Sequence, residues 1–103
     1  MRKYIENIVP DFFKNWTNPN AVDHERSVLY AGNKIFSYKT CIGAMDWASG
    51  KPVLFLNKKK YSATTSTLQN ALRNYADYYS VQVVEVEPDD SALSGRIGIV
   101  NNF

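Results

Sequence analysis

The sequence predicts a small α+β domain, in which a mostly antiparallel sheet of four to five strands is packed by an N-terminal helix and one central helix. Three observations predict this class. Apolar residues recur at helical spacing near the N-terminus. Strand-like apolar runs bounded by turn residues follow. A second helical pattern then precedes a last strand-like run.

The chain of 103 residues is expected to form a single domain, 1–103. Residues 1–25 are predicted to form a helical segment and a loop, residues 26–87 the α+β core, and residues 88–103 a tail or a short edge strand. Hydrophobic residues make up 45% of the chain, which is enough for one core at this length.

The cysteine and histidine content excludes several classes of protein. The one cysteine, Cys41, rules out an intrachain disulfide and favours a reducing compartment. Because there is one histidine, His24, the four ligands of a structural zinc site are not expected. Polar residues interrupt the apolar stretch at the N-terminus, so we expect neither a signal peptide nor a membrane span. We therefore predict a cytoplasmic protein without a membrane partner.

The first helix is predicted from an apolar stripe at helical spacing. Its members are Ile5, Ile8, Val9, Phe12, Phe13 and Trp16. Pro10 lies within the stripe and cannot donate to the helix, so either the helix kinks or a second short helix begins there. We expect the apolar face to cover a sheet, in preference to a membrane surface or a partner helix. Residues 17–25 are interpreted as a loop.

Strands are predicted after this loop. A Gly-Asn pair at 32–33 between two apolar runs indicates a hairpin. Over 36–42, apolar and polar residues alternate, which places Tyr38 on the inward face. A Ser-Gly turn at 49–50 precedes the run 53–56, which is apolar on both faces and therefore typical of a central strand.

The central helix is predicted to begin with a capping box, with Ser66 as the N-cap residue and Gln69 three positions later. Its apolar spacing predicts a helix over 67–79, ending at residue 78 or 79. Residues 81–87 are predicted to form a strand that the following proline ends. A loop and a short edge strand at 96–100 complete the prediction.

No pair of catalytic groups emerges from the sequence. His24 lies between two acidic residues and is interpreted as part of a solvated loop. The pair Asp89-Asp90 is interpreted as a solvated acidic turn, and Cys41 as a structural thiol. The signature motifs of nucleotide-binding loops and hydrolases do not occur. We therefore expect a protein that is not an enzyme and that uses no cofactor and no metal.

Charge is distributed unevenly along the chain. Residues 1–25 carry a net charge of −1, residues 26–76 carry +7 and residues 77–103 carry −4, which together give +2. A basic middle region suits an anionic partner. In the alternative interpretation, the acidic end folds over the basic middle and neutralises it.

The segment "KKKYSATTSTLQN", residues 58–70, combines groups that bind phosphate. Lysines supply charge, hydroxyls supply hydrogen-bond donors, and the start of a helix favours an anion. A tyrosine in the segment can stack on an unpaired base. In the alternative interpretation, the hydroxyls only cap the helix and the lysines form a soluble loop. The candidate residues for binding nucleic acid or another anion are Lys58, Lys59, Lys60, Tyr61, Ser62, Thr64, Thr65, Ser66, Asn70 and Arg73.

The pair of motifs "SYKT" at 37–40 and "KYSATTSTLQN" at 60–70 resembles a family of small proteins encoded by bacteriophages and related mobile elements. The resemblance covers about residues 28–79, and Leu68 stands where family members often have His. It implies a phage-type origin and action in the cytoplasm of an infected host, and it implies no reaction. The matching positions are Ser37, Tyr38, Thr40, Lys60, Tyr61, Ser62, Thr64, Thr65, Ser66 and Asn70.

Three functions are compatible with these observations. The first is a non-enzymatic module that binds nucleic acid or another phosphate-bearing partner through the basic middle region. The second is a protein-binding inhibitor of a host defence system, similar to an anti-CRISPR factor, with a host protein as its partner. The third is a virion or assembly component that forms a homo-oligomer through the aromatic N-terminal stripe.

Overall fold

The structure is a computed structural model that describes residues 2–87 of the chain. The described part consists of two helices and a six-stranded sheet, which confirms the α+β class and the mostly antiparallel sheet. The predicted number of four to five strands was too low. In chain order the elements are α1 (Lys3–Asn15), β1 (Val22–Glu25), β2 (Val28–Ala31), β3 (Lys34–Ser37), β4 (Thr40–Ala48), β5 (Lys51–Asn57), α2 (Ala63–Tyr78) and β6 (Gln82–Val86). The strands lie in the sheet in chain order; β1 to β5 are antiparallel, and β6 is parallel to β5.

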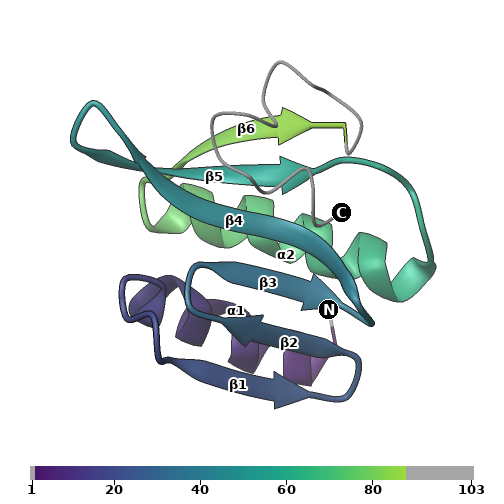
Figure 1. The fold of residues 1–103 in the computed structure, drawn as a ribbon. Helices are drawn as coiled ribbons and strands as arrows, with labels where there is room; N and C mark the ends of the chain where they lie inside the picture. The colour runs from purple at the N-terminus through teal and green to yellow at the C-terminus, as the bar shows by residue number, and fades with distance from the viewer. Residues whose placement is uncertain (1, 88–103) are drawn as a thin grey trace.

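Both helices cover the same face of the sheet (Figure 1). α1 contacts β1 and β2, α2 contacts β5 and β6, and the two helices contact each other. The predicted stripe of α1 is buried in the core between these layers, which confirms that this helix covers a sheet. α1 is continuous through Pro10, so the alternative in which a second helix begins at that residue is wrong.

The two predicted hairpin turns are confirmed. Gly32 connects β2 to β3 with φ +59°, and Gly50 connects β4 to β5 with φ +77°. Glycine adopts these left-handed conformations without steric cost. Strand β5 is paired with a neighbour on both sides, which confirms the prediction of a central strand.

Two parts of the sheet differ from the prediction. Residues 17–25 were expected to be a loop, but Val22–Glu25 forms the edge strand β1, and most of its side chains are exposed. The run 36–42 was expected to be one strand, but the chain turns at Tyr38 and Lys39 between β3 and β4. Tyr38 has φ +58° and is 63% exposed, so its placement on the inward face was wrong.

A second apolar cluster lies on the face of the sheet opposite the helices. Along β5, Leu54 and Leu56 belong to the core under the helices, whereas Val53 and Phe55 belong to the second cluster, as the two-residue period of a strand requires. Cys41 is fully buried in this second cluster. The loop and the edge strand predicted for 88–100 lie outside the described residues.

Candidate functional site

The fold brings the segment 58–70 to one end of the molecule. Strands β1, β3 and β5 all end there, so the turns after β1 and β3 lie beside the loop after β5 and the start of α2 (Figure 1). The backbone N–H of Tyr38 donates to the carbonyl of Ser27 at 2.7 Å, which joins the two turns. The Ser37 hydroxyl lies 2.8 Å from that of Thr65, which joins β3 to α2.

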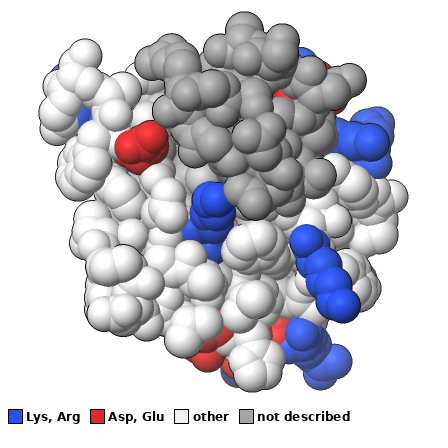
Figure 2. Space-filling view, in the orientation of Figure 1, with Lys and Arg blue, Asp and Glu red and all other residues white. Residues whose placement is uncertain are grey.

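This topology gathers positive charge that is dispersed in the sequence. We define the basic end as seven exposed cations from four segments of the chain. They are Arg2, Lys3, Arg26, Lys39, Lys58, Lys59 and Lys60. Figure 2 shows Lys and Arg side chains along the right-hand margin of the molecule, the side at which β1, β3 and β5 end in Figure 1.

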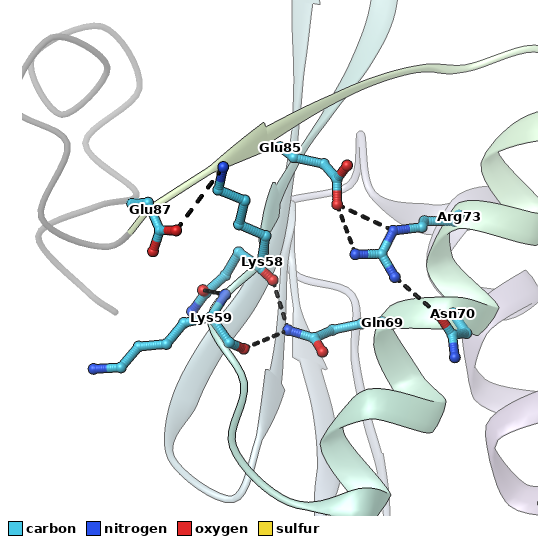
Figure 3. Close-up of polar contacts among 8 residues, drawn as sticks. Lys58, Lys59, Gln69, Asn70, Arg73, Glu85 and Glu87 are labelled. Carbon is cyan, nitrogen blue, oxygen red and sulfur yellow. Dashed lines mark hydrogen bonds and ion pairs between the residues drawn. The ribbon is translucent and has the colours of Figure 1, made fainter.

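The lysine loop, residues 58–60, is held by buried amide side chains (Figure 3). Gln69 of α2 donates to the carbonyl of Asn57 at 2.7 Å and to that of Lys59 at 2.9 Å. The side-chain oxygen of Asn57 accepts from the backbone N–H of Lys59 at 2.9 Å. The loop backbone is therefore fixed, whereas all three lysine side chains are exposed.

Tyr61 presents an aromatic surface beside these lysines. It is 42% exposed, and its hydroxyl accepts from the Asn57 amide at 3.0 Å. The ammonium nitrogen of Lys59 lies 5.8 Å from the centre of the Tyr61 ring. A ring held at its hydroxyl and open on its surface is suited to stacking on a base.

The start of α2 differs from the prediction. The N-cap is Ser62, whose hydroxyl accepts from the backbone N–H of Thr65 at 3.2 Å, and the helix begins at Ala63. The predicted capping box of Ser66 and Gln69 is therefore wrong by one helical turn. Ser66 lies within the first turn, and Gln69 is only 4% exposed.

Most hydroxyls of the segment have partners within the protein. Thr65 is 2% exposed and bonds to Ser37, and its hydroxyl also accepts from that of Ser62 at 3.2 Å. The hydroxyl of Thr64 accepts from Arg2. The hydroxyl of Thr67 donates to the carbonyl of Ala63 at 3.0 Å. Hydrogen bonds within the protein therefore occupy most of the hydroxyls that the sequence offered as phosphate ligands.

Asn70 and Arg73 lie further along α2, away from the lysine loop in sequence and in bonding. Arg73 donates to the Glu85 carboxylate of β6 at 2.6 and 3.2 Å and to Asn70 at 2.9 Å (Figure 3). Lys58 lies 3.9 Å from Glu87. The interpretation in which acidic residues neutralise the basic middle therefore holds for Arg73 and, more weakly, for Lys58. Both pairs are exposed, and exposed ion pairs stabilise a protein little.

The remaining titratable candidates are His24, Cys41 and the pair Asp89-Asp90. His24 is exposed on β1 rather than in a loop. Burial raises the pKa of the Cys41 thiol to about 12, so the thiol stays protonated at neutral pH. Between residues 2 and 87 there is no cluster of three or more His, Cys, Asp and Glu side chains that suits a metal ion. The pair Asp89-Asp90 lies outside these residues.

Neither described helix has the length and apolar character needed to cross a membrane. Comparison with protein-family models, curated proteins and solved structures found no match.

Four cations of the basic end were missed as site residues from the sequence. They are Arg2, Lys3, Arg26 and Lys39. Arg26 and Lys39 lie in turns at 26–27 and 38–39. These turns were not predicted, because neither contains Gly, Pro, Asn or Asp.

Proposed function

We propose that this chain is a small non-enzymatic accessory protein of phage type that binds nucleic acid, or another phosphate-bearing partner, through the basic end. One observation carries the proposal: cations from four separate segments converge beside the start of α2. Lysine and arginine side chains that neutralise phosphates supply most of the affinity for nucleic-acid backbones. The phage-type origin rests on the two sequence motifs at 37–40 and 60–70.

Tyr61 favours a single-stranded nucleic acid over a duplex. Its ring is exposed beside the lysine loop, and an aromatic side chain next to cations is the arrangement by which proteins bind unpaired bases. Stacking on one base contributes about 1–3 kcal/mol by alanine substitution. In this proposal the lysines contact the strand backbone and Tyr61 contacts a base.

The proposed function is tested by fluorescence anisotropy with labelled single-stranded and double-stranded DNA and RNA at two salt concentrations. We expect binding to a single strand that weakens as the salt concentration rises, because released counterions favour binding at low salt. Substitution of Lys58, Lys59 and Lys60 by Ala should weaken that binding. The absence of binding to all four probes at low salt would refute nucleic acid as the partner, and unchanged binding by the triple variant would refute the role of the basic end.

The two other functions gain less support from the described residues. A protein-binding inhibitor can mimic nucleic acid with acidic side chains or wedge into an interface. For mimicry, the acidic residues Glu85 and Glu87 face Arg73 and Lys58, and no described contact favours a wedge. An oligomer contact through the apolar stripe of α1 conflicts with its burial against the protein's own sheet. We therefore propose neither.

A further inference from the structure

A pocket of about 820 Å³ lies between the start of α1 and the turns that follow β1 and β3. Sites for small ligands commonly have volumes of roughly 300–1,000 Å³. The residues that line the pocket include Arg2, Lys3, Tyr4, Glu25, Arg26 and Tyr38. Three of these side chains are cationic and one is a carboxylate, so the pocket suits a ligand with net negative charge.

Within the described part of the chain, one oxygen of the Glu25 carboxylate lacks a hydrogen-bond donor. Its Oε2 atom is buried, and it has no hydrogen-bond partner among the described residues. A buried acceptor without a donor costs free energy, more so when it is charged. Glu25 lines the pocket, so a ligand that carries N–H donors can pair with its carboxylate once the side chain turns Oε2 toward the pocket, whereas a simple anion would be repelled by the carboxylate. The pocket therefore favours a ligand that combines an anionic group with hydrogen-bond donors.

Two aromatic rings complete the pocket. The Arg26 guanidinium lies 5.6 Å from the centre of the Tyr4 ring, which orients this cation. Tyr38 is 63% exposed and is held at φ +58°, and Arg26 is held at φ +55°. Residues other than glycine rarely adopt a positive φ, and the residues that do so often cluster at binding sites. An exposed ring beside a cation suits a planar, anionic ligand.

We propose that this pocket binds a guanine nucleotide. The phosphate group contacts Arg2, Lys3 and Arg26, the base stacks on Tyr38, and the adjacent N1–H and N2–H groups of guanine donate to the Glu25 carboxylate. Adenine has no such pair of adjacent donors, so a carboxylate at this position selects guanine. Proteins read unstacked bases at this edge by the same kind of bond.

The nucleotide can be free or can belong to a strand. The lysine loop does not line the pocket, although Arg2, Lys3 and Arg26 of the basic end do, so binding of a free nucleotide is independent of the lysine loop. Recognition of a guanine within a strand rests on the proposed function, because the rest of that strand would follow the basic end. Thr64, which also lines the pocket and bonds to Arg2, connects the pocket to the start of α2.

Isothermal titration of the full chain with GMP, AMP, guanosine and inorganic phosphate tests the proposal. We expect GMP to bind at least about tenfold more tightly than AMP, because a hydrogen bond to a charged group is worth that much or more. GMP should also bind more tightly than guanosine. Equal affinities for GMP and AMP, or no saturable binding of GMP at millimolar concentration, would overturn the proposal.

Three variants locate the binding. Glu25→Gln should remove the preference for GMP over AMP. Arg26→Asn should weaken GMP and AMP alike by roughly tenfold, and Asn tolerates the positive φ of this position. The control Lys51→Ala removes an exposed charge at the opposite end of the sheet and should change neither affinity. Each variant must first show the cooperative thermal unfolding of the parent chain. If Glu25→Gln does not, Tyr38→Asn replaces it and should weaken the binding of GMP. A folded pocket variant that binds GMP like the parent would contradict the assignment.

Competition by single-stranded decamers separates the two sources of the nucleotide. If a guanine-containing decamer displaces GMP and an all-adenine decamer does not, the pocket reads a guanine within a strand. If neither decamer displaces GMP, the pocket takes the free nucleotide. The variant with Ala at 58, 59 and 60 should keep its affinity for GMP, so the outcome for this pocket is independent of the outcome for the lysine loop.

Discussion

Thr65 and Ser37 form a buried hydroxyl pair that joins α2 to the end of β3. Thr65→Val keeps the shape of the side chain but leaves the Ser37 hydroxyl buried without this partner. We expect a loss of about 1–3 kcal/mol in the free energy of unfolding, measured by urea denaturation, because an unpaired buried polar group bears its full desolvation cost. Thr67→Val removes a more exposed hydroxyl and is the matched control. Equal losses for the two variants would contradict a special role for the buried pair.

Two buried groups are expected to lower the stability of the fold at alkaline pH. Burial raises the pKa of Cys41 from 9.0 to about 12. Burial, together with a hydrogen bond to Asp11, raises that of Tyr30 from 10.0 to about 12. Folding favours the neutral forms, so their contribution is complete below pH 9 and is lost as the pH rises toward 12.

Because the pKa values of Cys41 and Tyr30 are higher in the folded than in the unfolded chain, we predict that the melting temperature falls between pH 9 and pH 11. A second measurement isolates the thiol: Cys41 should react with a thiol reagent at pH 8 only after the chain is unfolded in urea. Rapid stoichiometric reaction of the folded protein would show that Cys41 is accessible, in disagreement with its burial.

At the scale of single elements, the start of α2 gives a sharp test. Ser62→Ala should destabilise the protein by about 1 kcal/mol, because the hydroxyl of Ser62 caps the helix. Ser66→Ala, the same chemical change four residues later, should alter the free energy of unfolding by less than about 0.5 kcal/mol. Thermal or urea denaturation of the two variants decides between the observed cap and the one predicted from the sequence. A larger loss for Ser66→Ala would favour the predicted cap.

The elements predicted correctly are those with strong local signals. The apolar stripe of α1, the two turns that contain glycine and the continuous apolar run of β5 each encode their structure within a few residues. Strand β1 was missed because it is an edge strand with mostly exposed side chains, so its sequence lacks alternation. The turn at Tyr38 was missed because alternation continues through it in the sequence.

The start of α2 was misplaced for a related reason. The segment contains Ser62 and Ser66 at a separation of one helical turn, and both can cap a helix. Ser66 was preferred because the sequence pattern of Ser66 and Gln69 matches a capping box. In the structure Gln69 instead binds the carbonyls before and within the lysine loop, a long-range contact that local pattern does not reveal.

At the scale of the whole molecule, the candidate site was predictable only in part. The lysine loop and Tyr61 are contiguous, so the sequence alone indicates them. Arg2 and Arg26 are separated from that loop by more than thirty residues, and only the order of strands in the sheet brings them to the same end. The buried Oε2 atom of Glu25, which has no hydrogen-bond partner among the described residues, depends on tertiary packing and has no signature in the sequence.

In the proposed function, the basic end binds the phosphates of a nucleic-acid strand. The most direct test is the slope of log affinity against log salt concentration for a single-stranded probe. For the variant with Ala at 58, 59 and 60, we expect the slope to become shallower by about 2, since each phosphate contact contributes about 0.7 for a single strand.

The matched control replaces Lys14, Lys34 and Lys51, which lie away from the basic end, and so removes the same net charge. Its slope should stay at the parent value. If the two triple variants shift the slope equally, binding depends on net charge alone, and the claim that one end of the molecule binds the strand is contradicted.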